Sequence, residues 1–455
     1  MKKLEPSPLS SFVLNPHVIE RLLSDDMTPI LTRINEEYYY WDKLKYQSLP
    51  EKVDHKDVWT LVKLRRKNTP YHLTFGKYSF HWNLNSRLQG YLHFLDMNIG
   101  GTLESSTIIS REDKNRYLIS SIMEEAIASS QIEGAVTTRK HAKEMLRKNI
   151  KPRNHSEQMI YNNYVTIQEI LELKSEPLGL QSFLNIHKLI TTNTLHSRKE
   201  EGSLRDNDDI KVIDTVDGSI VHHPPPISEL PSLLDDLIKF FNDDDPKLFI
   251  HPIIKACIIH FMIGFIHPFT DGNGRTARAL FYYYLLKKEY WLTEYLSISR
   301  LILKSKSSYA KAFLYSEIDD NDLTYFLIYN IRTMKLAFEE LRIYIRRKNE
   351  EKKQITEFLG VDGLTYRQTL ILEWFREEGG VILTISETGK RLGVSYMTAR
   401  TDLNELVQRG YLTIKNINKV LKGYVKADKF DTLLVRPKRL KTNPPFQGPS
   451  LFDKF

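Results

Sequence analysis

Turn-forming residues are scarce in this chain. Its 455 residues include only 20 glycines and 19 prolines, a share below the roughly 12% of average chains. Apolar residues recur at helical spacing between them, as from Tyr117 to Ile132. The 24 tyrosines, 21 phenylalanines and 5 tryptophans can fill sizeable cores. We therefore predict a mainly α fold, and at roughly 150 residues per domain about three domains.

The helical pattern suggests where the domains lie. It is mixed over residues 1–110, becomes regular from Arg111, and ends in a charged run at 346–353. We expect an N-terminal region at 1–110 that packs on a helical core at 111–354, followed by a C-terminal domain at 355–455. One segment, Lys211–Val221, interrupts the helices with two short β-branched runs around Asp217 and Gly218, and this pattern predicts a β-hairpin.

The C-terminal domain has the pattern of a winged helix-turn-helix. A helix is predicted over Thr365–Glu377, a second is capped by Ser386, and a third follows the turn at Gly393 and ends near Arg409. Strands are predicted near Tyr411–Ile414 and Lys422–Val425, which completes the layout.

Two kinds of partner remain open for this domain. Residues 361–455 hold 16 basic and 10 acidic residues, whereas the whole chain has a net charge of +8, so an anionic partner such as DNA is possible. Asp402 and Glu405 on the third helix would oppose DNA, and winged helices also dock proteins. The domain is therefore expected to contact either DNA or protein.

The single cysteine, Cys257, excludes an internal disulfide and suits a reducing compartment. The most apolar stretch, Ala256–Phe269, is too short to span a bilayer, and the first residues lack a signal-peptide pattern. We expect a cytoplasmic protein with no membrane partner.

The densest group of reactive residues is His267-Pro-Phe-Thr-Asp-Gly-Asn-Gly-Arg-Thr-Ala-Arg278. A loop with two glycines feeds into a helix here, and helix N-termini bind anions. Arg275 and Arg278 lie three residues apart and can fork around phosphate oxygens. Asp271 supplies a hard oxygen for Mg²⁺ on those phosphates, and His267 is a candidate base.

This segment resembles the signature HPFx(D/E)GNGRxxR of the Fic family at every specified position. The resemblance implies a Fic-type helical core that transfers AMP from ATP to a Ser, Thr or Tyr hydroxyl of a protein and releases pyrophosphate. His267 would be the catalytic base, and Asp271 would hold Mg²⁺ or Mn²⁺. The ATP-binding residues would be Gly272, Asn273, Gly274, Arg275, Arg278 and, in the adenine pocket, Tyr309. Ser316 stands where the family has a nearby asparagine.

A second motif, Ser129-Ser-Gln-Ile-Glu133-Gly134, lies at the end of a helix expected at about 116–134. It resembles the family's inhibitory motif (S/T)xxxE(G/N). The resemblance implies that Glu133 pairs with Arg278 and blocks the γ-phosphate, as in self-inhibited members.

The predicted hairpin resembles the family's flap, which pairs with the target backbone. Its docking residues would be Lys211, Val212, Ile213 and Asp214. The target would be a protein with a hydroxyl side chain, and modification of this protein itself and a homodimer both stay open. Two other functions stay open: removal of AMP by hydrolysis at the same site, and a nucleotide-sensing DNA-binding regulator. Other histidines, including His187 and His260, are interpreted as structural.

Overall fold

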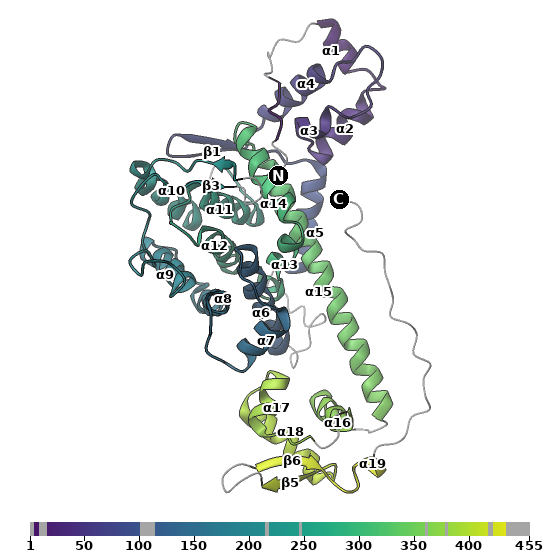
Figure 1. Cartoon of the computed structure of the whole chain (residues 1–455). Helices are drawn as coiled ribbons and strands as arrows, with labels where there is room; N and C mark the ends of the chain where they lie inside the picture. The colour runs from purple at the N-terminus through teal and green to yellow at the C-terminus, as the bar shows by residue number, and fades with distance from the viewer. Residues whose placement is uncertain are drawn as a thin grey trace. The chain divides into compact units, whose positions relative to one another are not determined.

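The computed structural model describes residues 4–8, 16–100, 114–213, 218–244, 248–359, 363–377, 381–416 and 422–433. The chain forms two compact units, Met1–Leu341 and Arg342–Phe455 (Figure 1). The helices of the first unit are α1 (Pro16–Leu22), α2 (Thr28–Glu37), α3 (Trp41–Leu44), α4 (His55–Lys67), α5 (Ser86–Ile99), α6 (Lys114–Ile132), α7 (Arg139–Arg147), α8 (His155–Leu173), α9 (Leu180–Thr191), α10 (Leu230–Asn242), α11 (Pro252–Ile266), α12 (Asn273–Lys287), α13 (Ile298–Lys304) and α14 (Lys306–Ile318). Helix α15 (Thr324–Leu359) begins in this unit and continues past Leu341. Short 3₁₀ helices span Ile227–Glu229 and Trp291–Tyr295.

Strands are few and short in the described residues. β1 (His72–Phe75) pairs with β2 (Tyr78–His81), and β3 (Val212–Ile213) pairs with β4 (Ile220–His222), both antiparallel. The predicted mainly α fold is therefore confirmed. The hairpin of β3 and β4 lies where we predicted it, whereas we predicted no strands at the positions of β1 and β2.

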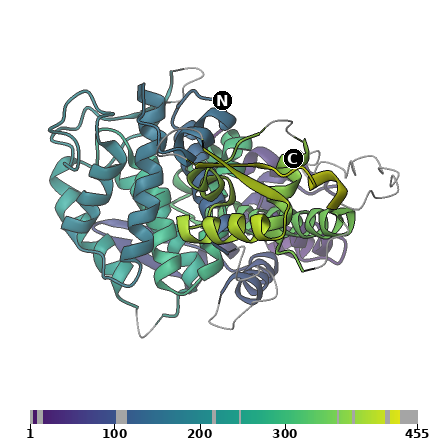
Figure 2. The same cartoon turned by 90° about the horizontal axis from the view of Figure 1, so that it is seen from below.

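Helices α11 and α12 lie side by side in the first unit (Figure 1), and Figure 2 shows the chain from below. α11 is buried almost all round, because nearly every residue from Ile253 to Ile266 is apolar. Helices α6, α8 and α9 pack against α12, and α10 packs against α11. This packing fixes the short loop between α11 and α12 on a rigid base.

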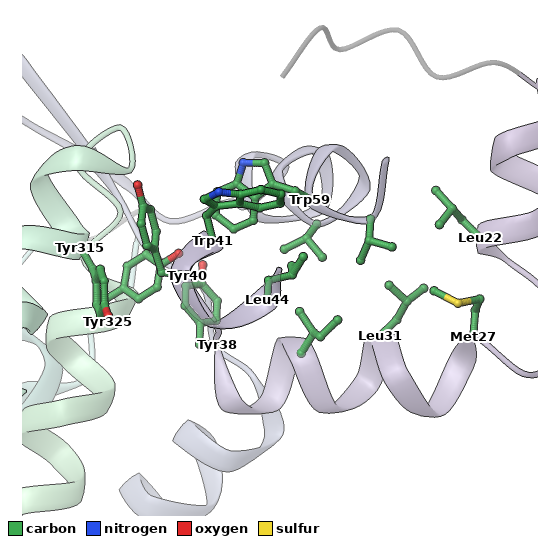
Figure 3. Close-up of a cluster of buried hydrophobic side chains, with 13 residues drawn as sticks. Leu22, Met27, Leu31, Tyr38, Tyr40, Trp41, Leu44, Trp59, Tyr315 and Tyr325 are labelled. Carbon is green, nitrogen blue, oxygen red and sulfur yellow. The ribbon is translucent and has the colours of Figure 1, made fainter. Parts of the chain in front are cut away.

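An aromatic cluster joins the N-terminal helices to α14 and α15 (Figure 3). Tyr40 from the N-terminal region stacks on Tyr315 of α14, with ring centroids 4.9 Å apart. It also meets Trp59 of α4 edge-on at 5.6 Å. Aromatic pairs in these geometries add to the stability that burial alone gives.

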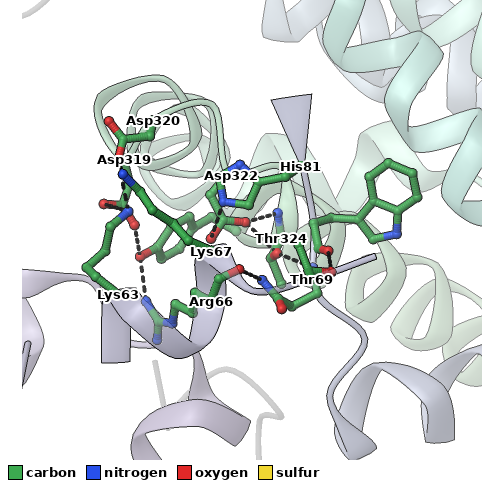
Figure 4. A network of polar contacts seen from close by, with 12 residues as sticks. Lys63, Arg66, Lys67, Thr69, His81, Asp319, Asp320, Asp322 and Thr324 are labelled. Atoms are coloured by element: carbon green, nitrogen blue, oxygen red, sulfur yellow. Dashed lines mark hydrogen bonds and ion pairs between the residues drawn. The ribbon is translucent and has the colours of Figure 1, made fainter. Parts of the chain in front are cut away.

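A buried polar network fixes the turn between α14 and α15 (Figure 4). Lys63 of α4 donates to Asp319 Oδ1 at 2.7 Å, and both side chains are almost fully buried. Arg66 donates to the Tyr325 hydroxyl at 2.8 Å, and that hydroxyl donates to Asp319 Oδ2. Buried charges are tolerated when they are paired and hydrogen-bonded in this way.

The second unit contains α16 (Tyr366–Glu377), α17 (Ile385–Leu392), α18 (Tyr396–Gln408) and α19 (Phe430–Leu433), and its β5 (Leu412–Asn416) pairs with β6 (Lys422–Lys426). Its core contains Ile371, Leu372, Phe375, Leu392, Leu403, Leu406 and Tyr424. The order of helices and strands confirms the predicted winged helix-turn-helix. The predicted cap of α17 was wrong. Thr384, not Ser386, has extended backbone and accepts the N–H of Glu387.

Within the described part of the chain, no helix combines the length and the apolar character that a membrane span requires.

Candidate active site

His267 ends α11 in a left-handed conformation, with φ 49° and ψ 58°. Side chains other than glycine rarely adopt this conformation, and it is often found at functional sites. Its carbonyl accepts a hydrogen bond from Arg205 Nε at 3.1 Å, and the Arg205 N–H donates to the Pro268 carbonyl at 2.9 Å. Arg205 is buried and comes from the segment after α9, so a residue distant in sequence holds the histidine's backbone.

The ring of His267 is set to accept a proton. Nδ1 lies 3.3 Å from the Gly264 carbonyl, which can only accept, so Nδ1 carries the hydrogen and Nε2 keeps its lone pair. Burial lowers the pKa of His267 to about 4, and the nearby positive charge of His222 also lowers it. The ring is therefore neutral at pH 7, as a general base must be.

The loop after His267 is held by its own side chains. The Asn273 amide accepts from the Phe269 N–H at 3.0 Å and donates to the Phe269 carbonyl at 2.8 Å, so it is committed to shaping the loop. Gly272 has φ 84°, and a Cβ there would lie 2.8 Å from Thr191 Cγ2, so only glycine fits.

His187 of α9 also supports this loop. Its ring stacks flat on Phe269 at 3.6 Å, and Nε2 donates to the Asp271 carbonyl at 2.9 Å. Nδ1 accepts the Gly202 N–H, and burial lowers the pKa of His187 to about 4, so the ring is neutral. We predicted a structural role for this histidine but not its position, because no motif links it to the loop.

The first two turns of α12 present two buried guanidinium groups. Arg275 and Arg278 are 1% and 3% exposed. Arg275 donates to the Ile190 carbonyl at 3.2 Å. Within the described residues, Nε of Arg275 has no hydrogen-bond partner, and neither has Nη1 of Arg278. Buried donors without acceptors are costly. Together with the free N–H groups of a helix start, they fit an anionic ligand such as a triphosphate.

Asp271 lies at the edge of this anion site. Its side chain is 61% exposed, Oδ1 accepts the Gly272 N–H, and Oδ2 lies 3.7 Å from Arg275 Nη2. A single exposed carboxylate next to an anion site suits Mg²⁺, which proteins hold through one or two carboxylates and phosphate oxygens.

The end of α6 reaches into the anion site. Glu133 Oε1 accepts from Arg278 Nη2 at 2.9 Å, Ser129 Oγ accepts from Arg278 Nε at 2.9 Å, and the Ser129 carbonyl accepts from Nη2 at 3.0 Å. A Cβ on Gly274 would collide with the Glu133 carboxylate, so this carboxylate lies directly against the helix start. Gly134 follows with φ 95° and turns the chain away.

The other predicted residues lie at two further places in the first unit. The Tyr309 hydroxyl is 2.8 Å from His260 Nε2, and its ring contacts Phe313 and Phe326. Arg278 and Glu133 are close enough to Tyr309 to affect its pKa, although burial has the largest effect and raises it. Ser316 is fully buried, and its hydroxyl has no partner among the described residues.

The predicted flap is an exposed two-stranded ribbon. Lys211 and Ile213 are exposed, Val212 is half-buried, and Asp214 lies outside the described residues. Ile213 and Ile220, which pair across the ribbon, leave about half of their side-chain surfaces exposed.

The outer face of α18 differs from our expectation. Asp402 is 3% exposed and pairs with Arg367 Nε at 2.6 Å, and Glu405 accepts from Gln368. The prediction that these two acids oppose DNA was therefore wrong, because both turn inward to α16. The exposed residues of the helix include Tyr396, Met397, Arg400 and Thr401.

Two segments of the chain match known domain families. Residues 177–285 match the Fic/DOC family, and residues 367–418 match the DeoR-like helix-turn-helix domain. The chain therefore contains a Fic/DOC domain and a C-terminal helix-turn-helix domain of the DeoR-like type.

Curated relatives are similar over part of their length. A protein named protein adenylyltransferase Fic from Nematostella vectensis is 32% identical over 124 residues, which cover 27% of this chain and 25% of that protein. Protein adenylyltransferase fic-1 from Caenorhabditis elegans is 51% identical over 47 residues, 10% of this chain and 9% of that protein. The chain thus spans a quarter or less of the length of these relatives.

Among solved structures, a Fic family protein from Desulfovibrio desulfuricans G20 has a TM-score of 0.48 at 19% identity, covering 76% of this chain and 98% of its own. Fic-1 from C. elegans has a TM-score of 0.46 at 18% identity, and the match covers 73% of this chain and 88% of that protein's chain.

Proposed function

We propose that this protein is an autoinhibited protein adenylyltransferase, which transfers AMP from ATP to a Ser, Thr or Tyr hydroxyl of a protein. The observation that carries the proposal is the pair of buried, unpartnered guanidinium donors at the start of α12, beside a neutral histidine. The donors suit a polyphosphate, and the histidine suits the removal of a proton from a hydroxyl. The names of the curated relatives support the same activity.

In the proposed reaction, His267 Nε2 takes the proton of the target hydroxyl while that oxygen attacks the α-phosphorus of ATP. The bond to the β-phosphate oxygen breaks, and pyrophosphate leaves. Arg275 and the N–H groups at the start of α12 bind phosphate oxygens, and Arg278 binds the γ-phosphate. Mg²⁺ or Mn²⁺, held by Asp271 and the phosphates, would neutralise charge on the leaving group.

Glu133 controls this reaction in the proposal. Its carboxylate occupies Arg278 Nη2, which the γ-phosphate also needs, and it carries a like charge to the phosphate. ATP can therefore bind productively only when Glu133 has moved away. Lys306 of α14 donates to the carbonyls of Gln131 and Ile132, and so stabilises the end of α6 in its closed position.

Intact-mass analysis tests this proposal. Wild type and Glu133→Gly would be incubated with ATP and Mg²⁺, alone and with candidate target proteins. The expected result is a gain of one AMP on the protein itself or on a target, faster for Glu133→Gly. If neither protein modifies any substrate, including itself, the transferase proposal is contradicted.

A second candidate function is DNA binding through α18, either to a specific sequence or without sequence preference. With Asp402 and Glu405 turned inward, the helix exposes Arg400, Thr401 and Tyr396, which can meet phosphates and base edges. A gel-shift assay with the full chain and random duplex fragments at low salt tests this function. If the full chain shifts no duplex at low salt, this result would favour the alternative that the domain docks a protein.

A further inference from the structure

One histidine outside the signature makes two hydrogen bonds that a neutral ring cannot make together. His222 of β4 is buried, with Nδ1 2.7 Å from Glu317 Oε2 and Nε2 2.7 Å from the Phe265 carbonyl. A carboxylate and a carbonyl oxygen both accept, so both ring nitrogens must donate. Only the imidazolium form has two N–H groups. The exposed neighbour His223 has no such environment.

We propose that His222 is a positioning residue for AMP transfer: as an imidazolium, it fastens the flap to the end of α11 that carries His267 and to α14. This inference rests on the proposed function, because it assigns a role in that reaction. His222 does not itself touch the reacting atoms in this proposal. It acts through the backbone two residues before His267 and through the strand expected to pair with the target.

The position of the charge suits the end of α11. The last carbonyls of a helix lack partners within the helix, and a positive charge there is favourable. His222 satisfies the Phe265 carbonyl, and the His267 N–H bonds to the Ile263 carbonyl. A neutral His222 would lose one of its two bonds and leave a buried acceptor unsatisfied.

Two titratable groups act on this charge from the neighbouring elements. Burial lowers the pKa of His222, but the hydrogen bond and charge of Glu317 on α14, with the Phe265 carbonyl, outweigh burial and raise that pKa above its ordinary value. His267 at the end of α11 is the second group, and the positive charge of His222 lowers its pKa.

Glu317 is itself held in place through α14. Two residues after it, Asp319 is fixed by Lys63 of α4 in the buried network (Figure 4). Eight residues before it on the same helix lies Tyr309, the candidate adenine-pocket residue. The His222–Glu317 pair thus connects the flap to the helix expected to line the nucleotide site.

The direction of the pH effect follows from the raised pKa. The two hydrogen bonds of the His222 imidazolium form a clamp between the flap, α11 and α14. This clamp is complete below the ordinary imidazole pKa of about 6.5, and it is lost as the pH rises through the higher pKa of His222 in the folded protein. AMP transfer to a protein should therefore decline on the alkaline side. Without His222, the pKa of His267 should rise, which moves the acidic limb of the profile to higher pH.

The test uses the full chain in the Glu133→Gly background, with His222→Gln compared with the matched control His223→Gln. We expect His222→Gln to slow protein modification roughly tenfold, the cost of one hydrogen bond to a charged group, and to remove the alkaline limb. ATP affinity should stay near that of the control. Glu317→Gln should shift the alkaline limb to lower pH. Profiles of His222→Gln that superimpose on the control would overturn the proposal.

Nitrogen NMR of the His222 ring gives a readout that needs no activity. At pH 6.5 both ring nitrogens of His222 should be protonated, and the ring should lose a proton only above the ordinary imidazole pKa of about 6.5. A neutral His222 ring at pH 6.5 would overturn the imidazolium clamp. If the ring is an imidazolium but Glu133→Gly transfers no AMP, the transferase proposal and with it the catalytic role fail, while the charged clamp stands.

Discussion

Replacing Glu133 by glycine should raise AMP transfer by up to about a hundredfold. The magnitude follows from one charge-assisted hydrogen bond of 2.9 Å between a guanidinium that is 4% exposed and a carboxylate that is 29% exposed. Hydrogen bonds to charged groups contribute about 1.5–3 kcal/mol. At about 1.4 kcal/mol per tenfold change, a bias of about 2.8 kcal/mol leaves roughly 1% of molecules open. Removing the carboxylate releases Arg278 from Glu133 in all of them, while the bonds of Arg278 to Ser129 remain.

The assay is the initial rate of AMP incorporation at saturating ATP and Mg²⁺. Ser129→Ala is a second variant that weakens the contact only in part, because Arg278 Nε loses its acceptor while the Glu133 carboxylate and the Ser129 carbonyl remain. It should activate less than Glu133→Gly. Arg278→Ala should be inactive in either background, because the γ-phosphate anchor is gone. If Glu133→Gly is no faster than wild type, the contact between Glu133 and Arg278 does not inhibit transfer. If it instead loses an activity that removes AMP, hydrolysis becomes the leading function.

Further predictions concern the base, the flap and the C-terminal helix. His267→Ala in the Glu133→Gly background should reduce the rate of AMP transfer by a factor of roughly 10²–10⁴. An unchanged rate in that variant would exclude His267 as the base. With His267 intact, kcat/KM should fall as the pH drops towards the pKa of His267, which is about 4. Val212→Pro should impair protein modification but not ATP binding measured by calorimetry, because proline removes a ladder donor; equal loss of both would make the flap only structural. If α18 binds duplex DNA, log affinity should fall with log salt at a slope of about −0.9 per neutralised phosphate, and Arg400→Ala should reduce that slope; a salt-independent shift would contradict phosphate contact.

Local patterns predicted most of the fold and the centre of the site. The helices from α8 to α12 follow apolar spacing that is visible in the sequence, and the start of α18 follows from Ser395, which caps it. The order from His267 to Arg278 is contiguous, so its loop and helix start could be predicted from neighbouring residues. The pairing of Glu133 with Arg278 came from the family resemblance, and the geometry now places the two in contact.

Residues that act across long sequence separations could not be predicted in this way. Three side chains from other elements support the signature loop or helix α11, which precedes it, and each does so through a backbone carbonyl: Arg205, His187 and His222. Backbone carbonyls are present at every residue, so no sequence pattern marks such pairs. The inward turn of Asp402 was missed for a related reason, since its partner Arg367 lies on another helix.

Labelled ATP tests the central claim most directly. Glu133→Gly protein would be incubated with Mg²⁺ and ATP carrying the label on either the α- or the γ-phosphate, and the protein would be separated from nucleotide. The account predicts that protein acquires the α-label, that the γ-label leaves as pyrophosphate, and that Arg278→Ala abolishes labelling. Protein labelled from the γ-phosphate, or from neither position, would contradict it.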